Sequence, residues 1–140
     1  MGIETIQNTI RANNAEIDSL YAEIRRLNEE MDRVLEAQGQ ISQKEKDLQN
    51  YLSEEKKIVT KIAAEKNVRT AVEYSNSMNT HLSGAKYRAA MSGIEKVKTA
   101  LSKRRTDIEA RIVWCKRRIA TLQEAVYKLN LQASNLNKVV

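Results

Sequence analysis

The apolar residues in the first third of the chain recur in alternating steps of three and four. Ile41 and Leu48 continue the series at seven-residue intervals, and one position within it, Asn13, is polar. The nine apolar positions that open the series are Ile3, Ile6, Ile10, Ile17, Leu20, Ile24, Leu27, Met31 and Val34. A heptad pattern of this length predicts a long helix of the coiled-coil type. Asn13 is either a register-setting polar residue of the seam or an unpaired asparagine near a frayed end.

The pattern weakens at Gly39 and fades between Asn67 and Gly84. At Gly39 we expect a kink or a loosened turn, because glycine in a helix costs about 1 kcal/mol relative to alanine. Between Asn67 and Gly84 the residues Ser, Thr and Asn become frequent, and these compete with helix through bonds to nearby backbone. The sequence therefore predicts that the chain reverses within residues 67–84.

A second heptad series occupies the C-terminal part of the chain. Two companion rows, each stepping by seven residues, contain Leu101, Ile108, Cys115, Leu122, Leu129 and Leu136, and Ile112, Ile119, Val126, Ala133 and Val140. The series predicts a second helix from about Ala85 to about Asn137, on the order of 80 Å long at 1.5 Å per residue.

Two long amphipathic helices with one connection predict an all-α fold, an elongated antiparallel helical hairpin of coiled-coil type. We expect a single domain over residues 1–140, with arms at 3–60 and 85–138 and an irregular or short-helix tip at 61–84. In the seam between the arms, we expect three residues to face the region of Leu122 and Val126, namely Leu20, Ile24 and Leu27.

Composition excludes several classes of protein. The 140 residues include no proline, which favours uninterrupted helices. One cysteine and one histidine leave no disulfide scaffold and little material for a zinc site or a catalytic triad. Cys115 lies in a heptad row and is expected to behave as a small buried hydrophobe. We therefore predict a protein that is not an enzyme, binds no cofactor or metal, and acts through interactions.

Charge is distributed unevenly along the chain. Residues 1–60 contain 12 acidic and 8 basic residues, a net charge of −4, whereas residues 61–140 contain 6 acidic and 16 basic residues, a net charge of +10. Arms of opposite sign attract each other and help to specify their pairing. The surplus basic residues suit an acidic arm or acidic partner better than nucleic acid, because no nucleic-acid-binding motif accompanies them.

A hairpin of two helices has a narrow core, so some large apolar residues stay uncovered, among them Tyr51, Trp114 and Tyr127. Uncovered apolar residues indicate a partner or self-association. Trp114 either closes the edge of the interface between the arms or anchors a partner helix, since tryptophan is enriched in binding hot spots. The predicted partner-binding residues are Trp114, Arg111, Arg118 and Tyr127.

The polar connection ends in the turn Leu82-Ser83-Gly84, which a small residue, Ala85, and an aromatic residue, Tyr87, follow. This arrangement resembles the WxG helical-hairpin superfamily of type VII secretion in Gram-positive bacteria. The likeness is greater to its YwqH-like group, whose members are encoded beside LXG-domain toxins. Leu82 stands where that family has tryptophan, so the chain resembles a divergent member.

The resemblance implies an adaptor that binds the helical N-terminal (LXG) domain of a toxin, with a second small helical secretion partner as a further possibility. We expect no signal peptide and no membrane span, and a cytoplasmic location with co-export as the alternative. Two other functions stay open. One is a coiled-coil structural protein that forms homo-oligomers, and the less favoured one is a basic nucleic-acid-associated protein.

Overall fold

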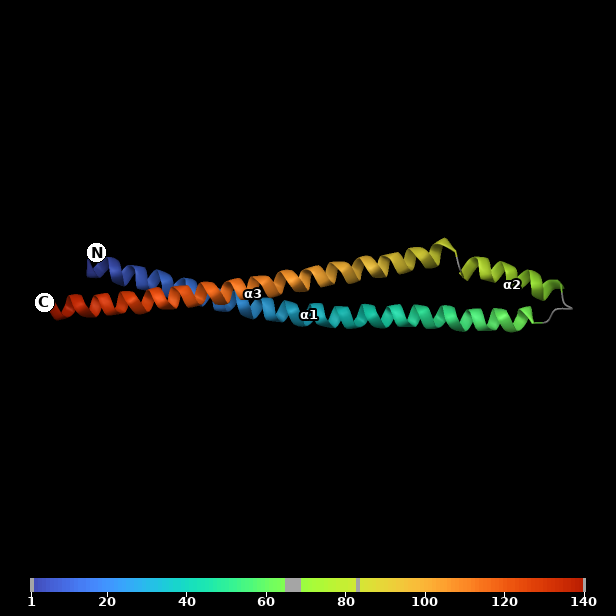
Figure 1. The fold of residues 1–140 in the computed structure, drawn as a ribbon, viewed down its shortest axis with the longest axis horizontal. Helices are drawn as coiled ribbons and strands as arrows, with labels where there is room; N and C mark the ends of the chain where they lie inside the picture. The colour runs from blue at the N-terminus through green and yellow to red at the C-terminus, as the bar shows by residue number, and fades with distance from the viewer. Residues whose placement is uncertain (1, 65–68, 83, 140) are drawn as a thin grey trace. The chain divides into compact units, whose positions relative to one another are not determined.

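The protein is all-α in the part that a computed structural model describes, residues 2–64, 69–82 and 84–139. These residues form three helices, α1 (Ile3–Ala63), α2 (Arg69–Leu82) and α3 (Ala85–Val139), and no strand (Figure 1). The chain divides into two compact units. Unit 1 contains Met1–Arg33 and Arg104–Val140, and unit 2 contains Val34–Lys103, so that α1 and α3 each contribute to both.

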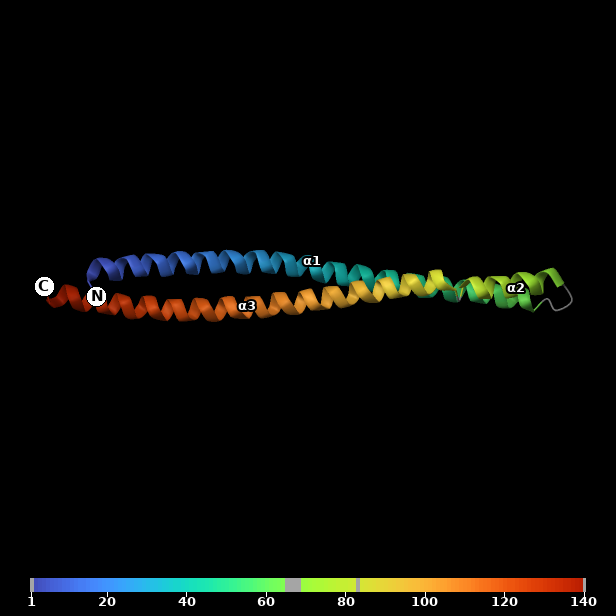
Figure 2. The same cartoon turned by 90° about the horizontal axis from the view of Figure 1, so that it is seen from above.

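Unit 1 is an antiparallel pair formed by the start of α1 and the end of α3, which lie side by side in both ribbon views (Figures 1 and 2). Ion pairs between the helices show the direction. Glu16 pairs with Arg118, whereas Glu30, two heptads further along α1, pairs with Arg104. Residue numbers therefore rise along one helix as they fall along the other, which confirms the predicted antiparallel hairpin.

The core of unit 1 contains residues of both helices. Its main cluster consists of five buried residues, which are Ile17, Leu20, Cys115, Ile119 and Leu122. Ile24 and Val126 are partly buried and pack against this cluster. All seven belong to the heptad rows, and the expected burial of Cys115 is confirmed.

The register of the two helices differs from the predicted one. Leu20 and Ile24 do share a cluster with Leu122 and Val126, but Leu27 is not among its residues. The residue numbers of each Glu–Arg pair add up to 134, which places Leu20 level with residue 114 and Leu27 level with residue 107. The predicted register was wrong by more than one heptad, because a shift of seven residues leaves the apolar pattern unchanged.

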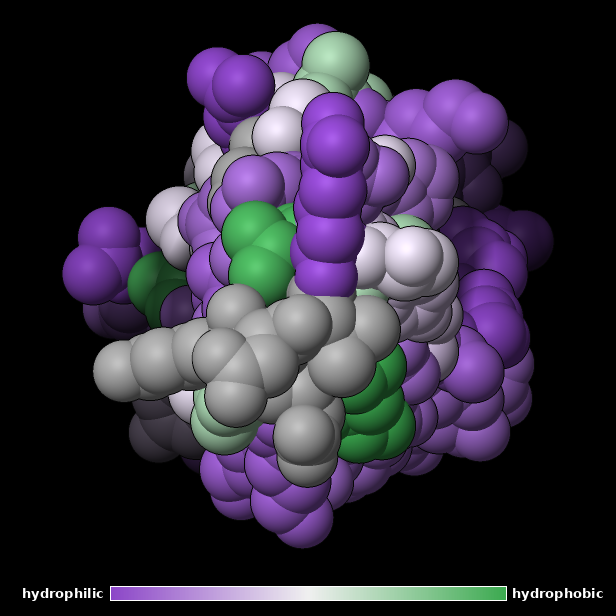
Figure 3. Space-filling view, turned by 90° about the vertical axis from the view of Figure 1, so that its right-hand side faces the viewer, coloured by the Kyte–Doolittle hydropathy of each residue, from purple (hydrophilic) through white to green (hydrophobic). Residues whose placement is uncertain are grey.

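Unit 2 combines the second half of α1 with α2 and the start of α3. Val59 and Ser75 are buried, and the Ser75 hydroxyl donates a hydrogen bond to the Val59 carbonyl oxygen at 3.5 Å. Lys98 of α3 pairs with Glu45 of α1 at 3.1 Å. Viewed from the end at the right of Figure 1, the surface is mainly hydrophilic, with small hydrophobic patches (Figure 3).

The polar stretch that was predicted to connect the arms is mostly helical. Ser75 to Thr80 lie within α2, which runs back along α1 from Arg69 onwards, so the chain has already reversed there. The hydroxyls are compatible with helix because they find acceptors: that of Thr80 donates to the Asn76 carbonyl, and that of Ser75 to α1. The tip thus contains a short helix, one of the two predicted forms. Asn67, where the predicted reversal begins, lies outside the described residues.

Gly84 lies between α2 and α3, and because it has no side chain its backbone can approach the last carbonyl groups of α2 closely. Its N–H donates to the His81 carbonyl at 3.1 Å, and its own carbonyl accepts from the Arg88 N–H at 3.3 Å. A Cβ atom at this position would lie 3.1 Å from the carbonyl oxygens of both Thr80 and His81, which is tighter than usual. Of the predicted turn, Leu82 is the last residue of α2, and Ser83 lies outside the described residues.

The helix bounds otherwise follow the heptad series. α3 begins at Ala85, where the second series predicts it, and α1 ends at Ala63, three residues beyond the predicted arm. α1 passes through Gly39 without interruption. The chain therefore does not reverse there, and a side chain at Gly39 would meet nothing within 4 Å.

Replacing Leu122 by alanine should lower the free energy of unfolding by about 2–5 kcal/mol, because the side chain is 4% exposed and leaves a cavity in the core of unit 1. Leu131 on the same helix is 49% exposed and gives a matched control. Leu131→Ala should cost less than about 1 kcal/mol. Urea unfolding followed by circular dichroism measures both, and equal losses would place the core elsewhere.

Candidate partner-binding surface

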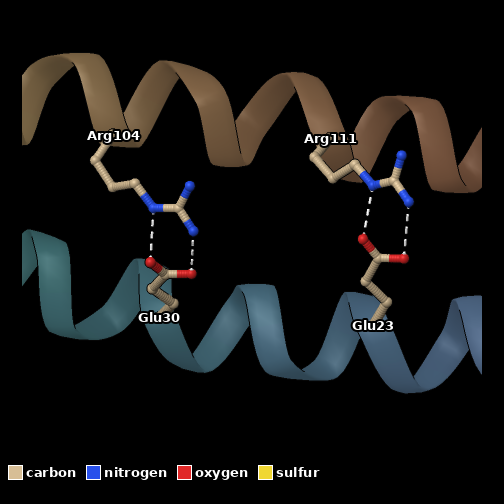
Figure 4. Close-up of polar contacts among 4 residues, drawn as sticks. All are labelled: Glu23, Glu30, Arg104 and Arg111. Atoms are coloured by element: carbon tan, nitrogen blue, oxygen red, sulfur yellow. Dashed lines mark hydrogen bonds and ion pairs between the residues drawn. The ribbon is translucent and has the colours of Figure 1, made fainter.

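Two bidentate ion pairs join α1 and α3 in unit 1 (Figure 4). The Arg111 guanidinium donates to both carboxylate oxygens of Glu23, at 2.6 and 3.1 Å. Arg104 donates to both oxygens of Glu30, each at 2.6 Å. Paired N–H donors on a planar carboxylate fix the orientation of both side chains as well as their distance.

A third pair of the same kind joins Arg118 to Glu16, at 3.0 and 3.4 Å. The acidic members, Glu16, Glu23 and Glu30, are seven residues apart, and so are their arginines. Heptad spacing keeps all three pairs on one side of the seam, next to the apolar rows. We call these contacts the three Glu–Arg pairs.

The Glu23–Arg111 and Glu30–Arg104 pairs shift the pKa values of their members in the direction that keeps them charged. Hydrogen bonds from Arg111 lower the pKa of Glu23 below its ordinary value, although burial acts in the opposite direction. Arg104 lowers the pKa of Glu30 in the same way. The carboxylates raise the pKa values of Arg104 and Arg111 in return. At neutral pH both pairs are therefore ionised.

Arg111 also contacts Trp114, the one tryptophan of the chain. Its guanidinium carbon lies 4.1 Å from the centre of the indole ring, a distance typical of a cation–π contact. The same guanidinium is held by its two hydrogen bonds to Glu23. The indole is thus supported in one orientation by a side chain that is itself fixed, while 47% of Trp114 stays exposed.

The four predicted partner-binding residues fall into two kinds. Trp114 and Tyr127 are exposed, at 47% and 64%, as expected of residues off the seam. Arg111 and Arg118 are engaged in pairs within the chain, so part of their charge is already neutralised by α1. Tyr51, expected to be uncovered, is exposed in unit 2.

In the unit 1 part of α3, two further exposed apolar residues escaped the sequence analysis, Val113 and Leu131. Val113 lies fourteen residues, or two heptads, before Tyr127, and Leu131 lies one turn after Tyr127. That spacing places them on one side of the helix and could have revealed them. Trp114, which directly follows Val113, points about 100° round the helix from it. The four exposed residues Val113, Trp114, Tyr127 and Leu131 are here called the outer apolar face, which extends over about 27 Å of α3.

Much of the basic surface is paired within the chain. Five of the nine Lys and Arg residues between positions 96 and 118 form ion pairs with glutamates, namely Lys98, Arg104, Arg105, Arg111 and Arg118. These pairs reduce the positive charge that is available to bind phosphates.

Cys115 is unsuited to act as a nucleophile. It is fully buried in the seam, and burial raises the pKa of its thiol, so the reactive thiolate is disfavoured. No group of three or more His, Cys, Asp or Glu side chains among the described residues could hold a metal ion. Nor does any helix in the described ranges have a segment long and apolar enough to cross a membrane.

No protein-family model matches the sequence, and comparisons with curated proteins and with solved structures find no match. Inference about function therefore starts from the outer apolar face and from the charges beside it.

The Glu23–Arg111 and Glu30–Arg104 pairs predict how stability depends on pH. Because the folded-state pKa values of Glu23 and Glu30 are lowered, their contribution is fully present above the ordinary value of 4.5 and is lost as the pH falls through the lower folded-state values. The double variant Glu23→Gln/Glu30→Gln should therefore be less stable than the wild type at neutral pH, and the difference should shrink below about pH 4. Urea unfolding at a series of pH values measures it.

Glu29→Gln/Glu36→Gln is the matched control, since both residues are exposed carboxylates of α1. We expect this variant to keep the wild-type dependence on pH. If the two double variants change in the same way, the Glu–Arg pairs are not the cause of the acid-sensitive stability.

Proposed function

We propose that this protein is a non-enzymatic helical adaptor of type VII secretion that binds the helical N-terminal domain of an LXG toxin. The observation that carries the adaptor function is the outer apolar face of α3, where four large apolar side chains about half exposed or more lie along one helix. Several large apolar side chains exposed on one helix favour a site that another protein covers. The toxin as partner rests on the resemblance at the turn before α3.

Binding would proceed by packing of a partner helix along the outer apolar face. Trp114 and Tyr127 provide the large apolar areas that binding hot spots use. Arg111 holds the indole of Trp114 before the partner arrives, which lowers the conformational entropy lost on binding. Arg111 is thus a positioning residue for Trp114 in this proposal.

The positive charge of the C-terminal part of the chain would attract an acidic partner before contact. Residues 104–140 contain eight basic and three acidic residues, a net charge of +5. Such a surface raises the association rate with an acidic partner more than it raises the affinity. Arg118, 41% exposed beside its partner Glu16, can offer its remaining donors to a carboxylate at the rim.

Self-association as a coiled-coil structural protein is the second candidate, because an identical copy could bury the same outer apolar face. A nucleic-acid-associated protein is less well supported, since five of the nine clustered basic residues already pair with glutamates. A gene for an LXG toxin next to the gene of this protein would favour the adaptor.

Trp114→Ala should weaken the complex with the N-terminal domain of the neighbouring toxin by about tenfold or more, mainly through a faster off-rate, because a large anchor is lost. Surface plasmon resonance with the purified domain measures both rates. Tyr74→Ala is the matched control: Tyr74 is an aromatic residue of unit 2 with the same 47% exposure as Trp114. Tyr74→Ala should leave both rates within about twofold of the wild type.

Three outcomes would contradict the adaptor function. In the first, Trp114→Ala leaves both rates unchanged. In the second, the protein forms a stable homo-oligomer that Trp114→Ala dissociates, and no toxin domain binds. In the third, the wild type binds duplex DNA tightly at physiological salt and no protein partner is found.

A further inference from the structure

A second candidate surface lies in unit 2, on the second half of α1. A groove of about 710 Å³ runs beside residues 49–61 and is bounded on α3 by Tyr87. Its apolar lining comes from Leu52 and Tyr87, which are both half-buried. Its charged lining comes from three exposed lysines, Lys56, Lys57 and Lys61.

The groove has the form that a further helix requires. Its lining positions on α1 recur every three or four residues from 49 to 61, so they occupy one side of the helix over about 18 Å. Amphipathic helices bind in grooves through anchors with this spacing. A partner helix of about twelve residues would match the length of the groove.

The apolar part of the groove continues into a smaller hollow of about 280 Å³. Leu52 and Tyr87 line both spaces, and Leu48, Tyr51 and Met78 complete the apolar lining of the hollow. α1, α2 and α3 all contribute to it, within unit 2. An apolar side chain that enters from the groove would find three or more apolar neighbours there.

The charge of the groove is positive and mostly unpaired. Lys57 forms an ion pair with Glu54 at 3.3 Å, and both side chains are largely exposed. Within the described ranges of the chain, Lys56 and Lys61 form no ion pair. Residues 34–103 as a whole contain twelve basic and eight acidic residues, a net charge of +4.

We infer that this groove binds an acidic amphipathic helix of another protein. An apolar anchor of that helix would pack on Leu52 and Tyr87, and carboxylates one turn apart on its flank would pair with Lys56 and Lys61. Three lysines are fewer than the six to ten phosphate contacts typical of strong salt-dependent DNA binding, so a protein helix suits the groove better than nucleic acid. The inference does not depend on the proposed function, whose surface lies on α3 in unit 1.

The test uses the full chain and a fluorescein-labelled designed helix of about sixteen residues, with leucines at heptad spacing and glutamates on their flanks. Fluorescence anisotropy should show saturable binding of this peptide and much weaker binding of the same peptide with lysines in place of the glutamates. Lys56→Glu/Lys61→Glu should weaken binding by about tenfold or more. Lys44→Glu/Lys46→Glu makes the same change of charge on exposed residues of α1 outside the groove and should weaken it by less than about threefold.

Four results would overturn the inference: equal weakening by both double variants, no weakening by either, equal binding of the lysine peptide, or displacement of the acidic peptide by duplex DNA. A dimer of the chain alone that Lys56→Glu/Lys61→Glu abolishes, measured by sedimentation, would make a second copy the occupant and also overturn it. Trp114→Ala should not change peptide binding, because Trp114 does not line the groove. If the peptide test fails, the proposed function of the outer apolar face is therefore unaffected.

Discussion

Two helices that pack against each other bury only one stripe of each, and the register between them depends on contacts beside that stripe. Apolar heptads are degenerate, because a shift by seven residues restores every apolar contact. In unit 1 the three Glu–Arg pairs remove this degeneracy, since only one register joins Glu16, Glu23 and Glu30 to three arginines. Each pair is partly exposed and contributes little stability by itself. Their main effect is to select one register of α1 against α3.

Because each helix buries only one stripe, much of its surface stays uncovered, and the candidate binding surfaces lie on this uncovered part. Seam residues such as Leu122 and Ile119 are buried by the facing helix, whereas no second helix among the described residues of unit 1 covers the opposite side of α3. Large apolar residues outside the seam, among them Trp114, therefore remain exposed in the single chain. Arg111 serves both sides of the helix, because it pairs with Glu23 across the seam and supports the indole of Trp114. Alignment of the helices and orientation of the anchor are thus coupled through one side chain.

Heptad periodicity predicted the all-α fold, the antiparallel arms, the start of α3 at Ala85 and the burial of Cys115. It could not predict the register, because Arg111 and Glu23 are 88 residues apart and periodicity is a local signal. The matching seven-residue spacing of the glutamates and arginines was nevertheless present in the sequence and would have indicated it. Whether the tip would be irregular or a short helix stayed open, because Ser75 disfavours helix in isolation, whereas in the structure it lies in α2 and bonds to Val59 of α1.

The two candidate surfaces differ in the force that would govern binding. On the outer apolar face the nearest arginines are already paired with α1, so affinity there would come mainly from removal of apolar area from water, and salt would act mainly on the association rate. In the groove of unit 2, Lys56 and Lys61 form no ion pair with the described part of the chain, and attraction between exposed charges is screened over about 8 Å at physiological ionic strength. Raised salt should therefore weaken an occupant of the groove more than a partner of the outer apolar face. Pairing within the chain thus decides which basic residues of this protein can take part in recognition.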